Sequence, residues 1–363
     1  MQKALEEDRK IQDAKSVQET LDLMRGKLEG IVPEFELAIK AELAFKINQL
    51  KKGMNAVILA HNYMEPALFH SVADYSGDSL ELARISAESD ADIIVFCGVR
   101  FMAETAKILN PDRIVLLPAE KAGCSLAQSI TGEDVRQLKN RYPGVPVVSY
   151  VNTYAEVKAE TDYCCTSSNA AAVIRYLADK GHDKIIFLPD EYLAKNVAAE
   201  TGIPILFPSR PDGSKGGDPE NLKRVLIGWR GRCEVHEKFT VEDIENVRAQ
   251  FTDTVILAHP ECSPEVVKAA DFSGSTKRMI EYVRNIDAPR YLLLTECSMG
   301  DNIAAENPDR EMLRLCSVRC PHMNLITLED TLKALREMRF RIELPDDIIK
   351  KARRSLDRML QIK

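Results

Sequence analysis

The segments Ala56-Val57-Ile58-Leu59-Ala60-His61 and Thr254-Val255-Ile256-Leu257-Ala258-His259 have nearly the same sequence, although they lie far apart in the chain. A third apolar segment, Pro146-Val147-Val148-Ser149-Tyr150, lies between them. Short runs rich in β-branched residues are typical of buried parallel strands. We therefore interpret the chain as three repeats of one structural unit, each beginning with such a strand.

The residues after each strand extend this interpretation. Some 17 or 18 positions beyond the strand end, each repeat has a hydroxyl-bearing residue of the kind preferred at a helix N-cap: Ser79, Ser167 or Thr276. A second apolar segment follows each predicted helix, at residues 92–96, 184–188 and 290–294. Strand, helix and strand repeated three times predict an α/β fold with parallel sheets.

The expected architecture is three similar three-layer α/β/α domains, with short parallel sheets around a pseudo-threefold axis, plus terminal helices. A segment rich in turn residues, Pro208 to Pro219, makes the second repeat longer and predicts a surface loop or lid. The expected domains are an N-terminal helical extension at 1–52, repeat 1 at 53–143, repeat 2 with its inserted loop at 144–250, repeat 3 at 251–330, and C-terminal helices at 331–363 that pack on repeat 1.

Composition limits the possible functions. The 363 residues have 45% hydrophobic and 29% charged side chains, which is ordinary for a globular protein of two or three domains. The formal net charge of −7 argues against a nucleic-acid partner, because phosphates need an excess of Lys and Arg. No segment has the ~20 apolar residues of a membrane helix, and residues 1–30 have no signal-peptide core. We expect a cytoplasmic protein without a membrane partner.

The nine cysteines predict metal ligation, catalysis or burial more than a disulfide framework, because their number is odd and the chain is large. One cysteine closes each repeat: Cys124, Cys233 and Cys320. Packed about a common axis, these three thiols would meet and could hold a [4Fe–4S] cluster with one open iron. Zinc is the competing metal, and three separately buried cysteines are the simplest alternative. Cys316 could replace Cys320 as the ligand.

Polar residues follow the first strand of each repeat. They form the triplets His61-Asn62-Tyr63, Tyr150-Val151-Asn152 and His259-Pro260-Glu261. Ligands of α/β sheets bind at the carboxyl ends of strands, so we expect these side chains to face one cavity. His, Tyr and Glu can act as acids and bases there. The three helix N-termini would add backbone N–H groups suited to carboxylates or phosphate.

These residues resemble the motifs of the quinolinate synthase family. The resemblance runs from about residue 55 to 330. Its segments are Ala60-His61-Asn62-Tyr63, Gly77-Asp78-Ser79-Leu80, Ala122-Gly123-Cys124-Ser125-Leu126, Tyr150-Val151-Asn152-Thr153, Cys165-Thr166-Ser167, Gly228-Trp229-Arg230-Gly231-Arg232-Cys233-Glu234-Val235-His236-Glu237, His259-Pro260-Glu261-Cys262, Gly274-Ser275-Thr276 and Cys320.

The resemblance implies condensation of iminosuccinate with dihydroxyacetone phosphate to give quinolinate, phosphate and water, in the synthesis of NAD. It also implies a [4Fe–4S] cluster on Cys124, Cys233 and Cys320, and substrate handover from an aspartate-oxidising enzyme. The residues that match iminosuccinate-binding positions are His61, Ser79, Tyr150, Val151, Asn152, Ser167, His259, Pro260, Glu261 and Thr276. Helix-cap alignment favours Ser79 over Asp78 at the first of the helix starts.

Our mechanistic hypothesis gives Glu261 the role of general base and Tyr63 an assisting role in proton transfer. His61 and His259 would orient substrate oxygens, and the open iron would act as a Lewis acid. His236, beside Cys233, is interpreted as support for that cysteine. A lyase of another pathway and a structural or sensing iron–sulfur protein are the rival classes. The paired groups at the strand ends favour catalysis.

Overall fold

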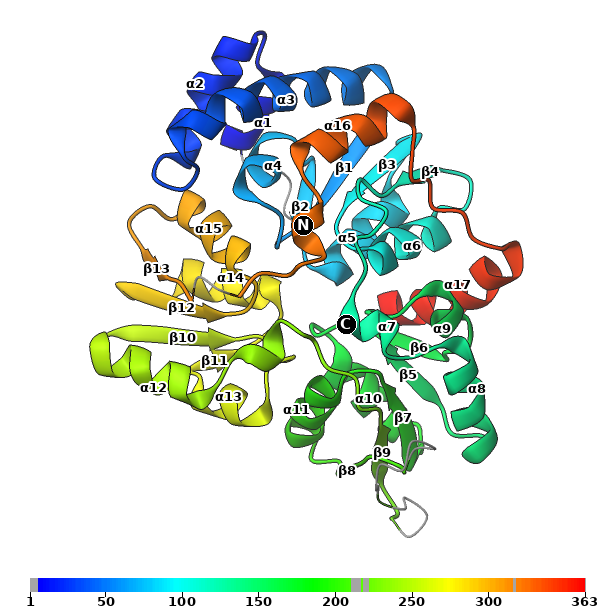
Figure 1. Cartoon of the computed structure of the whole chain (residues 1–363). Coiled ribbons are helices and arrows are strands. Elements are labelled where there is room, and N and C mark those ends of the chain that lie inside the picture. Colours follow the sequence, from blue (N-terminus) through cyan, green and yellow to red (C-terminus); the bar gives the residue numbers. More distant parts are fainter. Residues whose placement is uncertain (1–5, 210–216, 218–221, 316–317, 363) are drawn as a thin grey trace.

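The computed structural model describes residues 6–209, 217, 222–315 and 318–362. It contains three sheets, and every strand pair in them is parallel. Figure 1 shows the three sheets with their helices arranged around a common centre. This confirms the predicted α/β fold class, with three short parallel sheets. The limits predicted for the individual domains stay predictions.

The first sheet has the strand order β2-β1-β3-β4. Its central strands β1 and β3 are buried on both faces, which suits their unbroken apolar sequences. The elements of this part of the chain are β1 (Ala56–His61), α4 (Pro66–Ser71), β2 (Tyr75–Gly77), α5 (Ser79–Glu88), β3 (Ile93–Cys97), α6 (Arg100–Leu109), β4 (Ile114–Leu116), α7 (Ser125–Gln128) and α8 (Gly132–Arg141).

The second sheet repeats this order and adds one strand, giving β6-β5-β7-β9-β8. The predicted loop or lid at 208–219 lies largely outside the described residues. The elements are β5 (Val147–Tyr150), α9 (Ala155–Ala159), β6 (Tyr163–Cys165), α10 (Ala170–Asp179), β7 (Lys184–Leu188), α11 (Glu191–Thr201), β8 (Ile205–Leu206), β9 (Val225–Gly228), the 3-10 helix η2 (His236–Lys238) and α12 (Val241–Gln250).

The third sheet has the order β11-β10-β12-β13, the same as the first. In every sheet the strand that opens the repeat therefore lies between a very short edge strand and the strand after the predicted helix. The elements are β10 (Thr254–Ala258), α13 (Pro264–Ala269), β11 (Phe272–Ser273), α14 (Thr276–Asn285), β12 (Arg290–Leu294), α15 (Cys297–Glu306), β13 (Glu311–Leu313) and η3 (Met323–Leu325).

Helices from both ends of the chain cover the first sheet. At the N-terminus, α1 (Glu6–Asp13), α2 (Val17–Leu28) and α3 (Glu34–Gly53) all contact α4. At the C-terminus, α16 (Leu328–Glu337) contacts α3 and β3. The last helix, α17 (Asp346–Gln361), contacts α6 and also α9 and β6 of the second sheet. It therefore joins two of the three units.

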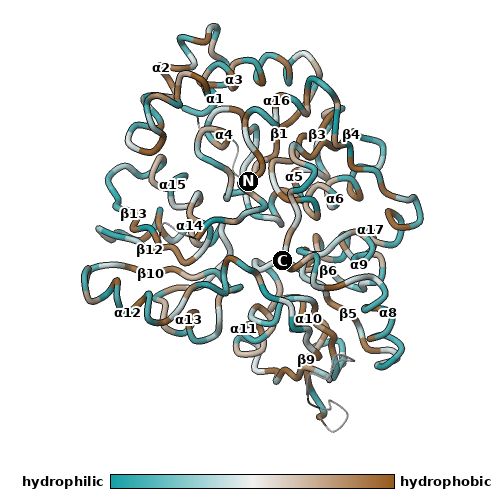
Figure 2. The backbone as a smooth tube through the Cα atoms, viewed as in Figure 1, coloured by the Kyte–Doolittle hydropathy of each residue, from teal (hydrophilic) through white to brown (hydrophobic). Residues whose placement is uncertain are grey.

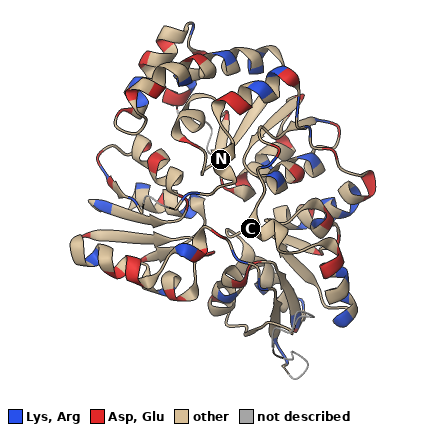
Figure 3. Ribbon diagram, in the orientation of Figure 1, with Lys and Arg blue, Asp and Glu red and all other residues tan. Residues whose placement is uncertain are grey.

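Hydropathy and charge follow this layering. Figure 2 shows hydrophobic segments along the strands, whereas the outer helices alternate between hydrophobic and hydrophilic residues. Figure 3 shows basic and acidic residues interspersed on those helices, without a face of one sign in this view. Among the described residues, no helix combines the length and apolar character needed to cross a bilayer.

The starts of the three repeat helices correct one expectation. The N-caps are Asp78 in α5, Asn169 in α10 and Ser275 in α14. Ser79 and Thr276 are instead the first residues inside their helices, and Ser167 lies two positions before its cap. Sequence could not separate these neighbours, because Asp, Asn, Ser and Thr are all good N-caps.

Candidate active site

A cavity lies where the three units meet, and residues of all three units line it. Twelve of the fourteen predicted site residues line it: His61, Tyr63, Ser79, Cys124, Tyr150, Asn152, Ser167, Cys233, His259, Glu261, Thr276 and Cys320. The other two, Val151 and Pro260, lie outside this lining. Val151 borders a small neighbouring pocket with Ser79, and the Pro260 carbonyl oxygen accepts a 2.8 Å hydrogen bond from Asn196 Nδ2.

The three cysteines occupy equivalent places in the fold. Cys124 precedes α7, Cys233 precedes η2 by three residues, and Cys320 precedes η3 by three residues. Burial raises the pKa of Cys124 to about 12 and that of Cys320 to about 11, and it raises the pKa of Cys233 well above its usual value. Such thiols are protonated at neutral pH unless a cation stabilises the thiolates. Cys316, the alternative ligand, lies outside the described residues.

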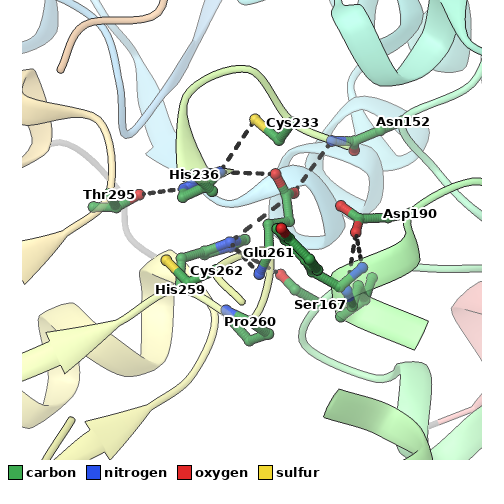
Figure 4. Close-up of polar contacts among 12 residues, drawn as sticks. Asn152, Ser167, Asp190, Cys233, His236, His259, Pro260, Glu261, Cys262 and Thr295 are labelled. Carbon is green, nitrogen blue, oxygen red and sulfur yellow. Dashed lines mark hydrogen bonds and ion pairs between the residues drawn. The ribbon is translucent and has the colours of Figure 1, made fainter. Parts of the chain in front are cut away.

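Glu261 lies at the centre of the polar contacts, as Figure 4 shows. Its Oε1 accepts a 2.5 Å hydrogen bond from the Tyr150 hydroxyl and a 3.4 Å one from Asn152 Nδ2, and its Oε2 lies 2.9 Å from His236 Nδ1. Burial alone raises the pKa of Glu261, but His236, His259 and Tyr150 outweigh it and hold the pKa below its usual value. Glu261 is therefore a carboxylate at neutral pH.

His236 links several site residues, although its sequence position predicted only a supporting role beside Cys233. Besides Glu261, its Nδ1 lies 3.2 Å from Cys233 Sγ, and its Nε2 lies 2.9 Å from Thr295 Oγ1. Its ring stacks on that of His259, with centroids 4.6 Å apart. The predicted support for Cys233 is present, but proximity to Cys233 in sequence gave no signal for the contacts with Glu261 and Thr295.

His61 and His259 have matching geometry at the carboxyl ends of β1 and β10. The Nδ1 of each accepts a 3.3 Å hydrogen bond from the backbone N–H two residues later, at Tyr63 or Glu261. Burial lowers the pKa of His61 to about 4 and that of His259 to about 3. Both rings are therefore neutral and carry their proton on Nε2. The His259 Nε2 lies 3.4 Å from Ser167 Oγ.

Two buried carboxyl groups occupy equivalent positions that sequence reasoning missed. Asp190 and Glu296 each lie two residues beyond a strand, after β7 and β12, and each caps the helix that follows. Burial raises the pKa of Glu296 to about 7 and that of Asp190 well above its usual value, with Glu261 adding to the effect at Asp190. Glu296 lines the cavity.

The lining has few fixed positive charges. Among the described residues that border the cavity there is no Lys or Arg, although Asp78, Glu234, Glu261 and Glu296 contribute carboxyl groups. An anionic ligand would therefore depend on N–H and O–H donors and on any bound cation for its stabilisation. At the start of α5, two backbone N–H groups are already taken, because Asp78 Oδ1 accepts from Leu80 and Glu81.

Two donor sets could hold a metal. Within the described residues, the ligand atoms of Cys233, His236 and Glu261 all lie within 4.8 Å of one another. The sulfurs of Cys124, Cys233 and Cys320 do not form such a compact group among those residues. One tetrahedral zinc ion would need sulfurs about 3.8 Å apart, because Zn–S bonds are about 2.3 Å long. Cys124, Cys233 and Cys320 all line the cavity, and cysteine thiolates are the ligands that iron–sulfur clusters require.

The fold and this cavity define an α/β enzyme whose site is assembled from the strand ends of three repeated units. Comparison with known proteins identifies the family. The model of the quinolinate synthetase A protein family matches residues 45–361, and the chain belongs to this family. Quinolinate synthase 2 of Mesorhizobium japonicum is 48% identical over 347 residues, which cover 96% of this chain and 99% of the relative. Quinolinate synthase of Agrobacterium fabrum is 50% identical over 336 residues, covering 93% and 90%. These findings confirm the resemblance seen in the motifs.

Proposed function

We propose that this chain is a quinolinate synthase of NAD biosynthesis, which condenses iminosuccinate with dihydroxyacetone phosphate to give quinolinate, phosphate and water. One observation carries the proposal beyond family membership. Three cysteines, distant in sequence, line the same cavity as the paired polar groups from the strand ends. A purely structural cluster would not need those polar groups.

The proposed cofactor is a [4Fe–4S] cluster held by Cys124, Cys233 and Cys320. When bound, such a cluster supplies an open iron that acts as a Lewis acid toward a substrate oxygen. The scarcity of positive side chains in the cavity lining supports a need for such a cationic group. The raised pKa values of the three thiols also support a bound cationic group, because burial destabilises thiolates that have no cation beside them.

The proposed substrate contacts use neutral donors. The Nε2–H groups of His61 and His259 would orient carboxylate oxygens of iminosuccinate, since both rings are uncharged. The hydroxyl groups of Ser79, Ser167 and Thr276 would add hydrogen bonds. The remaining proposed contact residues are Tyr150, Val151, Asn152, Pro260 and Glu261, although the side chains of Val151 and Pro260 lie outside the cavity lining.

Glu261 is the proposed general base. The geometry supports this role because Tyr150 and His236 fix both of its carboxylate oxygens inside the cavity. Its lowered pKa keeps it ready to accept a proton, although a carboxylate held this firmly is a weak base until substrate replaces one of its partners. Burial raises the pKa of Tyr63 well above its usual value, so its phenol keeps its proton and can donate a hydrogen bond.

The proposed substrate also implies a supplier. Iminosuccinate is the imine produced when aspartate is oxidised, so an aspartate-oxidising enzyme would have to provide it. Direct handover between the two enzymes is the corresponding proposal for a partner.

The test begins with anaerobic purification of the whole chain. We expect a brown protein with iron and sulfide, which forms quinolinate from iminosuccinate and dihydroxyacetone phosphate. Replacing Cys124, Cys233 or Cys320 with Ser should abolish the visible absorbance of the cluster and the activity. Cys297→Ser is the matched control, because Cys297 is partly exposed and is not among the described lining residues. A colourless protein containing stoichiometric zinc would contradict the proposal.

A further inference from the structure

A chain of hydrogen bonds connects Tyr63 to Glu261 through two residues that are outside the predicted site. The Tyr63 hydroxyl lies 2.5 Å from Thr295 Oγ1, and Thr295 Oγ1 lies 2.9 Å from His236 Nε2. The opposite ring nitrogen of His236 lies 2.9 Å from Glu261 Oε2. All four side chains are buried. Thr295 Oγ1 thus lies within hydrogen-bond distance of both the Tyr63 phenol and the imidazole beside the proposed base, whereas the Tyr63 hydroxyl itself is 3.5 Å from His236 Nε2.

The chemistry of these groups sets the direction of each hydrogen bond. A carboxylate can only accept, so His236 Nδ1 carries the proton that faces Glu261. In a neutral imidazole the Nε2 then accepts, and the Thr295 hydroxyl donates to it. A lone pair of the Thr295 hydroxyl accepts from the Tyr63 phenol. Thr295 then acts as donor to His236 and as acceptor from Tyr63 at the same time.

The repeated fold shows that this hydroxyl is not a structural requirement. Thr295 lies between the last residue of β12 and the N-cap of α15. The same place in the first unit, between β3 and α6, is Gly98, and in the second unit, between β7 and α11, it is Pro189. Neither residue has a side-chain hydrogen-bonding group. The strand-to-helix connection thus forms without a hydroxyl in two units, and only the third places one against Tyr63 and His236.

We propose that Thr295 is a positioning residue for the reaction. Its hydroxyl holds His236 in the tautomer whose Nδ1–H faces Glu261, and it fixes the Tyr63 phenol in the same network. This inference rests on the proposed function, since it assigns Thr295 a task in the acid–base steps of that reaction. Its location directly after a buried strand suits the task, because a rigid element fixes the hydroxyl more precisely than a loop would.

Three substitutions separate a hydroxyl role from a packing role. Thr295→Val keeps the volume and removes the hydroxyl, Thr295→Ala leaves room for a bridging water, and Thr295→Ser keeps the hydroxyl. We expect the serine variant to have a kcat close to that of the wild type, the alanine variant a lower kcat, and the valine variant the lowest. The valine variant should lose roughly 10- to 100-fold in kcat, as is usual when a group that orients a site residue is removed. KM should change little, because substrate contacts remain.

The assay uses the cluster-containing enzyme, with iron and sulfide content measured for each variant. The inference is overturned if the valine variant keeps the wild-type kcat. It is also overturned if the kcat of the valine variant is higher than that of the alanine variant, because that order is expected when Thr295 only fills space. If the valine variant fails to retain iron, the Ser and Ala variants decide: a lower kcat for Ala supports the inference, and equal values overturn it. If the wild-type enzyme forms no quinolinate, the proposed function itself fails, and the inference fails with it.

Discussion

The carboxylate of Glu261 receives hydrogen bonds from Tyr150, the last residue of β5, and from Asn152, and its Oε2 lies 2.9 Å from Nδ1 of His236 in η2. Glu261→Gln keeps the shape of this side chain but removes its charge and its ability to take a proton. We expect the cluster content to be unchanged and kcat to fall by roughly 10²- to 10⁴-fold, the usual range for a lost acid–base group. Steady-state kinetics with iron analysis provide the measurement.

Glu237→Gln is the matched control for this substitution, because Glu237 lies next to His236 in sequence but is exposed. Its kcat should equal that of the wild type. Near-normal turnover by the Glu261 variant would remove Glu261 from the role of base. Loss of iron in that variant would instead indicate that Glu261 contributes to the metal site. The ligand atoms of Glu261 and Cys233 lie within 4.8 Å of each other, as such a role requires.

Site residues at strand ends could be predicted from the sequence. Residues whose role depends on contacts with partners distant in the sequence could not. His61, Tyr150 and His259 lie at the carboxyl ends of recognisable strands, and repetition places them on equivalent edges of their sheets. By contrast, Thr295 contacts Tyr63 and His236, which are 232 and 59 positions away from it in the sequence. A single sequence has no signal for such a contact, because nothing local in it depends on the distant partner.

Among the secondary-structure elements, the repeat strands were predictable and their edge partners were not. The apolar runs at β1, β5 and β10 are long enough to show a strand pattern. The edge strands β2, β6 and β11 have only two or three residues, so no alternation can be read from them. They form because the neighbouring strand offers backbone partners, which is a tertiary effect.

The start of α5 gives a prediction that distinguishes the observed cap from the expected one. Asp78 Oδ1 accepts from the N–H groups of Leu80 and Glu81, and its Oδ2 accepts a 2.6 Å hydrogen bond from Ser168 Oγ. Asp78→Ala should therefore lower the free energy of unfolding by about 0.5–2 kcal/mol, the usual cost of a lost N-cap. Asp78→Asn should cost less, because Asn is an equally good cap. Chemical denaturation of the holoenzyme measures both.

Ser79→Ala is the control for this pair, since Ser79 is the first residue inside the helix and was the cap expected from sequence. Its free energy of unfolding should stay close to the wild-type value. A larger loss for Ser79→Ala than for Asp78→Ala would mean that α5 begins one residue later in solution.

Contacts between units close the whole molecule around the cavity. Asn62 Nδ2 donates a 2.9 Å hydrogen bond to Thr276 Oγ1, which joins the first and third units, and Asp78 and Ser168 join the first and second. Asn302 of α15 also donates to the backbone oxygens of Asn62 and Met64. The segment that carries Tyr63 is therefore held by the third unit as well as by its own.

The N-terminal helices complete the support of that segment from the other side. All six residues of α4, which begins just after Met64 and Glu65, are buried, and α1, α2 and α3 cover the helix opposite α15. His70 of α4 lies 3.1 Å from Asp8 of α1, with both side chains buried, and Gln12 Nε2 donates a 2.6 Å hydrogen bond to the Ala73 carbonyl oxygen. The extension thus acts as part of the first unit's core.

Asp8→Ala tests this structural role. It would leave His70 without its Asp8 partner, while His70 Nε2 already lacks one among the described residues. We expect the free energy of unfolding to fall by about 1–3 kcal/mol, the usual cost of an unsatisfied buried polar group. Glu7→Ala is the control, because Glu7 is exposed and its ion pair with Lys27 should contribute less than about 1 kcal/mol. Denaturation of the holoenzyme gives both values. Equal losses of unfolding free energy in the two variants would contradict a buried anchoring role for α1. A large fall in kcat for Asp8→Ala at full iron content would show that the extension influences the active site through its contacts with α4.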